Sequence, residues 1–416
     1  MAEKNFKSHN NSSLLVTATV GVVSLVTGVA LATYGLRLRD RERLRQATSR
    51  IRKNLYPCQR YALGPFLQPR KVKETVLVVG AGSYGTAMAY AAAVNHHEVV
   101  LFMRDTAQCE CINTQGYNPK YIGKDHPLSP EGNKIRGICA PDELKSLLQQ
   151  REKNLIVILA LPCQLTPKWL ATHKDWIQPD TLLVSTAKGL YVETKQLIGH
   201  AILDALDRAE QPLCFLSGPG FALDIVKGDP TNIVVASDRL VQAVRIQKLL
   251  SHPRRFRVYT SQDPVGVQLG GALKNPLAVG AGMIAGMGYG INTLSATITR
   301  ASSELCDLCI AMGGDPSTIH GLSGIGDLML TCFSPKSRNQ QCGQRLMKGE
   351  SIDEILKDMT VEGVATAQVA MAYAEMCGLD LPLFGMVHAL LSGKVKPPQA
   401  VELLMGRPLK HENTPH

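Results

Sequence analysis

Thr75-Val76-Leu77-Val78-Val79-Gly80-Ala81-Gly82-Ser83-Tyr84-Gly85 is the stretch that decides the fold of this 416-residue chain. An apolar, β-branched run ends in Gly-x-Gly-x-x-Gly, and the alanine-rich segment 86–93 that follows has the composition of a helix. In such a strand–turn–helix unit, Gly80 permits the turn, Gly82 lets backbone approach a pyrophosphate, and Gly85 lets the helix pack on the strand. The helix N-terminus supplies free N–H groups to phosphates. An ordinary glycine-rich turn is the alternative, but the flanking elements favour a dinucleotide loop, with Ser83 and Tyr84 among its cofactor-binding residues.

The next apolar run, 98–103, ends at Arg104-Asp105, roughly 20 residues beyond the last loop glycine, where a ribose-reading residue is expected. An acidic residue there favours NAD, whereas an arginine can bind the 2′-phosphate of NADP. This chain offers both, so the sequence leaves NAD and NADP open. A solvated ion pair at a strand end is the structural alternative.

Further strand-like runs follow at α/β spacing, at 155–161, 182–185, 213–217, 232–237 and 257–259. Near-continuous apolar strands predict a parallel sheet covered on both faces. The segments Leu161-Pro162-Cys163-Gln164 and Ser185-Thr186-Ala187-Lys188-Gly189 lie at the carboxyl ends of two of these strands. Ligands bind at that edge of an open α/β sheet, so Lys188 is a candidate site residue.

From about Asp263 helical periodicity replaces the strand pattern. Lys274 and Asn275 are the polar residues of a long apolar stretch that runs to Met287. A lysine in such surroundings is paired or functional, and burial makes it usable as a proton donor near neutral pH. Farther along, Ser337-Arg338-Asn339 suits a phosphate monoester because a guanidinium binds two phosphate oxygens at once.

Charge and cysteine content argue against two other functions. The net charge is +10, but residues 1–73 contain 14 Lys or Arg and three acidic residues, so the remainder of the chain carries −1. The positive charge thus belongs to the N-terminal segment, which argues against nucleic-acid binding by the rest of the chain. Only 5% of residues are aromatic, which argues further against nucleic-acid binding. The 11 cysteines indicate a reducing compartment, and neither Cys306-x-x-Cys309 nor Cys109-x-Cys111 has the partners of a metal site.

The N-terminal segment carries a candidate membrane anchor. Leu14 to Leu36 is a run of 23 uncharged residues, long enough to span a bilayer as a helix, and Arg37, Arg39, Arg41, Arg43 and Arg45 follow it. Positive flanks stay cytoplasmic, which predicts a membrane-anchored chain with its catalytic body in the cytosol. Targeting to an organelle, a mitochondrion or plastid, is one alternative, since such sequences are Arg-rich and acid-poor. A cleaved secretory signal is the other and fits less well, because its apolar core is shorter.

Several motifs in order resemble the NAD(P)-dependent glycerol-3-phosphate dehydrogenases, closer to the bacterial type, over about residues 74–410. They are GAGSYGTA, LPCQ, STAKG, LSGPGFA with Asp229-Pro230-Thr231, GALKN, GIGDLMLTC, SRN and Val361-Glu362-Gly363. The resemblance implies a Rossmann dinucleotide-binding domain followed by an all-α domain. It also implies NAD(P)H-dependent, reversible reduction of dihydroxyacetone phosphate to sn-glycerol 3-phosphate, and a homodimer.

The resemblance assigns roles to particular residues. Lys274 is the implied proton donor and acceptor, and Lys188 and Asp327 complete the catalytic group. Implied cofactor contacts beyond the glycine loop are Arg104, Lys188, Ala222, Arg338 and Glu362. Implied substrate contacts are Lys188, Gly218, Lys274, Asn275, Asp327, Thr331, Ser337, Arg338 and Asn339. The family loop usually reads Ser-Gly-Pro-Ser-Phe-Ala, and Gly220 here removes its second hydroxyl.

These observations divide the chain into a tail (1–13), a transmembrane helix (14–36), a basic linker (37–73), the dinucleotide domain (74–262), the helical catalytic domain (263–410) and a C-terminal tail (411–416). Two other functions are the alternatives. A related two-domain hydroxyacid or 6-phosphogluconate dehydrogenase would lack GIGDLMLTC and SRN together. A membrane-tethered NAD(P) sensor without catalysis would have lost one of the lysines or the aspartate, and all are present.

Overall fold

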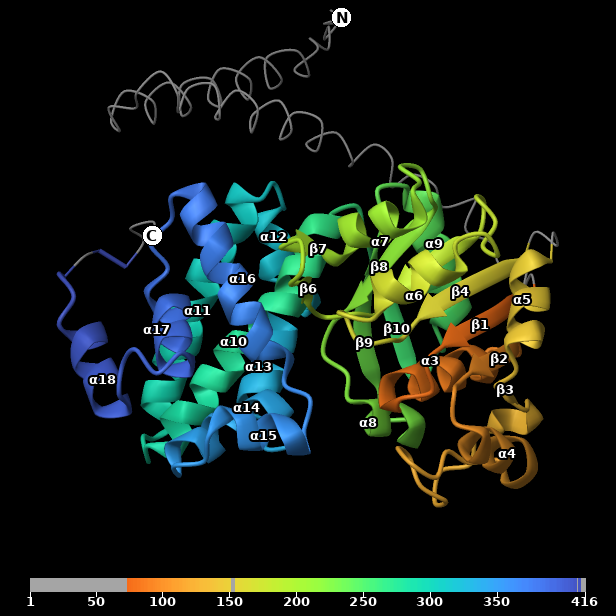
Figure 1. Cartoon of the computed structure of the whole chain (residues 1–416), viewed down its shortest axis with the longest axis horizontal. Helices are drawn as coiled ribbons and strands as arrows, with labels where there is room; N and C mark the ends of the chain where they lie inside the picture. The colour runs from red at the N-terminus through yellow and green to blue at the C-terminus, as the bar shows by residue number, and fades with distance from the viewer. Residues whose placement is uncertain (1–72, 151–153, 410, 413–416) are drawn as a thin grey trace, which may run out of the picture. The chain divides into compact units, whose positions relative to one another are not determined.

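A computed structural model describes residues 73–150, 154–409 and 411–412. Their first half forms an eight-stranded sheet in the order β10-β9-β8-β5-β4-β1-β2-β3 (Figure 1). The strands are β1 (Thr75–Val79), β2 (Glu98–Phe102), β3 (Arg136–Ile138), β4 (Leu155–Leu159), β5 (Leu182–Ser185), β8 (Leu213–Ser217), β9 (Thr231–Ala236) and β10 (Phe256–Ser261). A two-stranded hairpin, β6 (Leu190–Tyr191) with β7 (Gln196–Leu197), lies outside this sheet.

Two apolar layers cover the sheet. One packs against α3 (Ser83–Val94), α4 (Thr106–Gln115), α8 (Ala222–Lys227) and α9 (Leu240–Leu250), and the other against α5 (Pro141–Gln149), α6 (Thr166–His173) and α7 (Ile198–Leu206). Alternate residues of β1 face the two layers, with Val76 and Val78 on one side and Leu77 and Val79 on the other. A strand buried on both faces must be apolar throughout, which is why the continuous apolar runs identified it.

The prediction of an all-parallel sheet was wrong at one edge. Strands β9 and β10 are parallel to each other, but β9 pairs antiparallel with β8. The connection between β8 and β9 contains only the six-residue α8, which is about 9 Å long. A parallel pair needs a crossover that returns the chain to the opposite end of the sheet. Apolar composition does not encode strand direction, so the sequence could not reveal this reversal.

The second half is helical. Its elements are α10 (Pro264–Gly286), α11 (Ile291–Ala311), α12 (Pro316–Ile319), the π-helical η4 (Leu322–Gly326), α13 (Asp327–Phe333), α14 (Arg338–Met347), α15 (Ile352–Asp358), α16 (Glu362–Cys377), α17 (Pro382–Leu391) and α18 (Pro397–Met405). Helix α10 is buried along most of its length and packs on α11, α13, α14, α16 and α17. Gly282 and Gly343 allow its contact with α14, because a Cβ at either would lie within 2.0 Å of the facing backbone.

The Rossmann-like first half and the helical second half agree with the predicted fold class. Among the helices of residues 73–412 that the structure describes, none is both long enough and apolar enough to cross a membrane. The predicted tail, anchor and nearly all of the basic linker, residues 1–72, lie outside the described residues.

Candidate active site

The glycine loop joins β1 to α3 and has the geometry that a dinucleotide requires. Gly80 has φ +108°, and a Cβ at Gly85 would lie 1.9 Å from the Gly80 carbonyl oxygen. At Gly82, the residue before α3, an added Cβ would have no neighbour within 4 Å. The loop therefore leaves open space at the helix N-terminus, where a pyrophosphate can approach the backbone N–H groups. These features fit a bound NAD or NADP.

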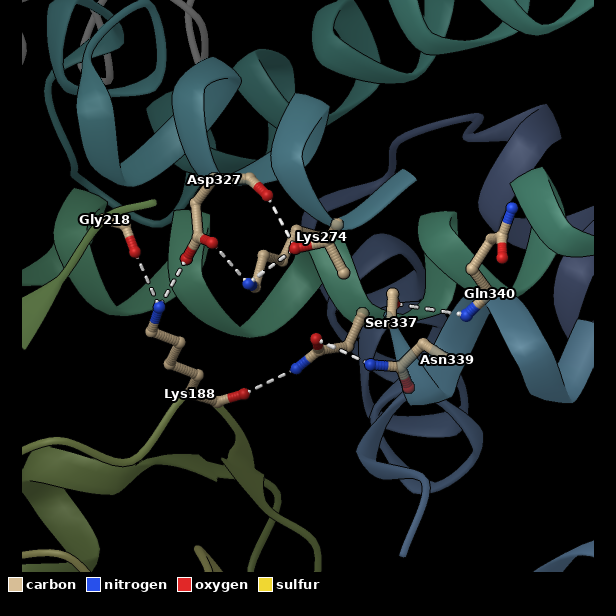
Figure 2. A network of polar contacts seen from close by, with 9 residues as sticks. Lys188, Gly218, Lys274, Asp327, Ser337, Asn339 and Gln340 are labelled. Carbon is tan, nitrogen blue, oxygen red and sulfur yellow. Dashed lines mark hydrogen bonds and ion pairs between the residues drawn. The ribbon is translucent and has the colours of Figure 1, made fainter. Parts of the chain in front are cut away.

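The polar centre of the site is a carboxylate shared by two lysines (Figure 2). Lys188 Nζ donates to Asp327 Oδ2 at 2.8 Å, and Lys274 Nζ donates to Asp327 Oδ1 at 2.5 Å. Lys188 follows β5, Lys274 lies in the middle of α10, and Asp327 begins α13 directly after the π-helical η4. Short π-helical segments often mark functional sites. Three separate elements thus bring two amines to one carboxylate.

Neighbouring groups complete the surroundings of both amines. Lys188 Nζ also donates to the Gly218 carbonyl oxygen at 2.7 Å, and Lys274 Nζ donates to Thr331 Oγ1 at 2.8 Å. The Thr331 hydroxyl in turn donates to the Asp327 backbone oxygen at 2.6 Å. Asp327 is fully buried, and Lys274 is 6% exposed. Such a buried ion-pair group is costly unless hydrogen bonds compensate it, and here each amine donates two.

The two lysines differ in their electrostatics. Burial and the positive charge of Lys188 lower the pKa of Lys274 to about 8, although Asp327 opposes the change. Burial also acts to lower the pKa of Lys188, but attraction to Asp327 and the hydrogen bond between them outweigh it, so that the pKa of Lys188 is raised. Lys188 thus lowers the pKa of Lys274, whereas the shared carboxylate dominates at Lys188. Lys274 is the amine suited to release a proton near neutral pH.

A chain of side-chain amides links the sheet to the helices α14 and α16. Asn275 Nδ2 donates to the Lys188 carbonyl oxygen at 2.7 Å, and Asn339 Nδ2 donates to Asn275 Oδ1 at 3.0 Å (Figure 2). The backbone N–H of Gly363 donates to Asn339 Oδ1 at 2.9 Å. The chain fixes the backbone of Lys188 relative to the start of α14. It also occupies the amides of Asn275 and Asn339, both of which the resemblance implied as substrate contacts.

The start of α14 carries the predicted phosphate group. The Ser337 hydroxyl is buried and accepts from Gln340 N at 3.3 Å, so it caps the helix. Arg338 is exposed at the first helical position. The N-terminus of a helix attracts anions through its free N–H groups and dipole. The side chain of Gln340 points away from the two lysines (Figure 2).

Some of the other predicted site residues lie near the two lysines, and others do not. The ring of Tyr84 lies under Lys188, with Nζ 5.6 Å from the ring centroid. The positive charges of Arg338, Lys274 and Lys188 act to lower the pKa of Glu362, but burial has the larger effect and raises it. Ala222 begins α8 and packs on the sheet, and Arg104 is exposed at the end of β2. Ser83 and Arg104 take no part in the polar network around Asp327.

Cys163 belongs beside this group, although we did not select it as a site residue. A Cβ at Gly189 would lie 3.2 Å from Cys163 Sγ and 3.5 Å from Glu362 Oε2. Gly189, Cys163 and Glu362 are therefore neighbours. Burial and the Glu362 charge raise the pKa of the Cys163 thiol, which keeps it protonated. Its position at the carboxyl end of β4 was the signal that could have identified it.

An open dinucleotide loop beside a buried lysine that can release a proton is the arrangement of a nicotinamide-dependent dehydrogenase. Comparison with known proteins narrows the class. Residues 75–243 match the family model for the N-terminus of NAD-dependent glycerol-3-phosphate dehydrogenase, and residues 263–402 match the model for its C-terminus. The chain therefore belongs to this family of oxidoreductases, whose cofactor is NAD or NADP.

Individual relatives agree with the family match. The chain is 36% identical to a glycerol-3-phosphate dehydrogenase [NAD(P)+] of Desulfovibrio desulfuricans over 82% of this chain and 99% of the relative. It is 38% identical to a chloroplastic glycerol-3-phosphate dehydrogenase [NAD(+)] of Arabidopsis thaliana over 80% of this chain and 78% of the relative. The crystal structure of the glycerol-3-phosphate dehydrogenase from Coxiella burnetii is 29% identical, with a TM-score of 0.72 over 80% of this chain and 99% of that one.

Proposed function

We propose that this chain catalyses the reversible, NAD(P)H-dependent reduction of dihydroxyacetone phosphate to sn-glycerol 3-phosphate. The observation that carries the proposal is Lys274, a buried amine with a lowered pKa that shares Asp327 with Lys188. The family membership of the chain supports the choice of substrate.

The two lysines and Asp327 account for the charge stabilisation and the proton transfer in this reaction. The loop of Gly80, Gly82 and Gly85 would hold the reduced nicotinamide dinucleotide, which would supply the hydride for the substrate carbonyl carbon. Lys188 and Lys274 stabilise the negative charge that develops on the carbonyl oxygen, and Lys274 delivers the proton that completes the alcohol. Asp327 holds both amines in place through its two oxygens. In the reverse direction Lys274 accepts the proton.

The N-terminus of α14 is the proposed phosphate site. Arg338 offers a guanidinium fork at the first helical position. The Ser337 residue binds the N–H groups of Gln340 and Gln341, which leaves the N–H groups of Arg338 and Asn339 for an anion. We expect Arg338→Ala to raise the KM for dihydroxyacetone phosphate about tenfold or more, because a charge-assisted bidentate contact is lost. Steady-state assays with both NADH and NADPH measure this KM, and an unchanged KM would place the phosphate elsewhere.

The enzyme is also proposed to be a membrane-anchored homodimer that supplies glycerolipid and phospholipid synthesis. The uncharged run 14–36 and the arginines behind it support an anchor with the catalytic body in the cytosol. Exposed apolar side chains on the helical half, among them Leu403 and Met405 of α18, support a dimer through that half.

Fractionation of cells that express the full chain tests the anchor. An anchored chain stays with membranes after a carbonate wash, and its mass includes residues 1–36. A shorter mature chain inside an organelle would support targeting to a mitochondrion or plastid instead. Light scattering of the purified chain tests the dimer, for which we expect the mass of two chains.

A further inference from the structure

The place of Tyr84 in the glycine loop does not account for its side-chain hydroxyl group. Its backbone belongs to the first turn of α3, where N–H groups face the cofactor phosphates. Its hydroxyl oxygen is buried and has no hydrogen-bond partner among the residues that the structure describes. A buried hydroxyl without a partner destabilises the fold, and such exceptions in folded proteins call for an explanation.

The surroundings of this hydroxyl belong to the reaction centre. The Tyr84 ring lies under the Lys188 ammonium group, 5.6 Å from centroid to Nζ. Burial raises the pKa of Tyr84, while Lys188 and Asp327 act on it in opposite directions. The phenol is therefore neutral at physiological pH and able to donate one hydrogen bond. Its ring lies beside the amine that, in the proposed function, stabilises the charge on the substrate carbonyl oxygen.

One polar group of the substrate has no partner in the proposed function. The proposed function assigns its phosphate to the start of α14 and its carbonyl oxygen to the two lysines. The free hydroxymethyl group remains. In the resembling family a serine hydroxyl stands in the loop after β8, but this chain has Gly220 there. A Cβ at Gly220 would lie 3.2 Å from the Thr231 methyl group, so a side chain at that position is crowded.

The other unpaired hydroxyl of the region is a weaker candidate. Ser217 Oγ is buried and unpaired, but a Cβ at Gly271 would lie 2.6 Å from it. It is therefore enclosed between β8 and α10. The Tyr84 hydroxyl is also buried, but its residue is only partly buried and its ring lies beside the Lys188 ammonium group.

We propose that the Tyr84 hydroxyl binds the free hydroxymethyl group of the substrate and so sets the specificity of this enzyme for a hydroxylated three-carbon phosphate. This inference rests on the proposed function. Tyr84 would then serve both ligands, the cofactor through its backbone and the substrate through its phenol.

A pair of substrates and a pair of variants test the inference on the full chain. Hydroxyacetone phosphate keeps the carbonyl and phosphate of dihydroxyacetone phosphate but has a methyl group in place of the hydroxymethyl group. Tyr84→Phe removes only the phenolic oxygen. Tyr90→Phe is the matched control, because Tyr90 lies on the same helix and its hydroxyl accepts from Arg255 at 3.0 Å, away from the site.

We expect Tyr84→Phe to lower kcat/KM for dihydroxyacetone phosphate about tenfold, the effect of one neutral hydrogen bond, and to leave kcat/KM for hydroxyacetone phosphate within twofold of wild type. The Kd for NADH stays unchanged, and Tyr90→Phe behaves as wild type. An equal loss with both substrates, or no loss with either, would overturn the inference.

A raised Kd for NADH in Tyr84→Phe would also overturn it, because the phenol would then contact the cofactor. Failure of the inference is separable from failure of the proposed function. A wild-type chain that reduces neither substrate contradicts the proposed function itself. If the wild-type chain reduces dihydroxyacetone phosphate, the result for Tyr84→Phe alone decides the inference.

Discussion

At the scale of single residues, one buried carboxylate holds two ammonium groups. Asp327 cannot neutralise both, so the centre carries a net positive charge in the absence of an anionic ligand. Replacing a buried ion pair by apolar residues is often neutral or stabilising, which makes stability a poor reason for this cluster. A developing negative charge on the substrate oxygen is a better reason, because it completes the charge balance only as the reaction proceeds.

The pKa of Lys274 predicts the pH dependence of both directions of the reaction. Reduction requires the protonated amine, so its kcat/KM should fall as pH rises through about 8. Oxidation requires the neutral amine, so its kcat/KM should rise over the same range. Initial rates from pH 6.5 to 9.5 measure both profiles.

Arg338→Ala is the matched control for this profile. It should weaken substrate binding and leave the midpoint in place, since Arg338 is exposed and makes no bond to Lys274. A reduction rate that stays flat from pH 7 to 9 would mean that another group supplies the proton.

The sequence and the family resemblance allowed most of these residues to be chosen, but did not show that one carboxylate serves both lysines. Lys188 is 139 residues from Asp327, and Lys274 is 53 residues from it. Motifs and the family resemblance identified each residue, whereas the shared carboxylate and the raised pKa of Lys188 depend on distances that no local pattern encodes. The amide chain through Asn275 and Asn339 was hidden for the same reason.

At the scale of elements, two glycines of the same loop serve different purposes, helix packing and ligand binding. Gly85 serves the packing of α3 on the sheet, since a Cβ there would meet both Gly80 and Ala160. Gly82 serves the ligand, since a Cβ there meets no protein atom within 4 Å. The same substitution at the two positions should therefore have different consequences.

We expect Gly82→Ala to fold with a Tm within about 2 °C of wild type and to bind NADH at least tenfold more weakly. Gly85→Ala should lower the Tm by many degrees or fail to fold, because a 1.9 Å contact with backbone cannot be relieved by a side-chain movement. Thermal unfolding and NADH titration measure the two effects. Equal loss of stability in both variants would contradict this division.

Helix α17 begins on a buried carboxylate from another helix. Glu304 of α11 is fully buried and accepts from Leu383 N at 2.9 Å and from Phe384 N at 3.2 Å. Burial and the charge of Asp380 raise its pKa to about 7, although these hydrogen bonds and Arg300 oppose the change. This residue joins two helices that are distant in sequence, and nothing in its own neighbourhood distinguishes it from a surface glutamate.

The raised pKa makes the stability of this contact depend on pH. Between its unfolded value of 4.5 and about 7, the folded state binds more protons than the unfolded state. Stability contributed by Glu304 should therefore increase as pH falls from about 7 to about 5. Glu304→Gln cannot titrate, so the difference in Tm between wild type and this variant should change across that range. A constant difference from pH 5 to 8 would contradict the prediction.

At the scale of the whole molecule, the sheet and the helical half each contribute what the other lacks. The first half holds the glycine loop and Lys188, and the second holds Lys274, Asp327 and Arg338. Strand runs and helical periodicity allowed the order of the two halves to be predicted. They did not show the reversal of β9 and β10, nor β3, whose three residues are too short to give a pattern.

The direct test of the account is NADH and NADPH oxidation by the full chain in the presence of dihydroxyacetone phosphate, compared with Lys274→Ala. The wild-type chain should form sn-glycerol 3-phosphate at the rate of nucleotide oxidation. Lys274→Ala should retain NADH binding and lose turnover by a factor on the order of 10²–10⁴, the usual effect of removing a positioned acid. Near-wild-type turnover in Lys274→Ala would contradict the assignment on which the mechanism depends.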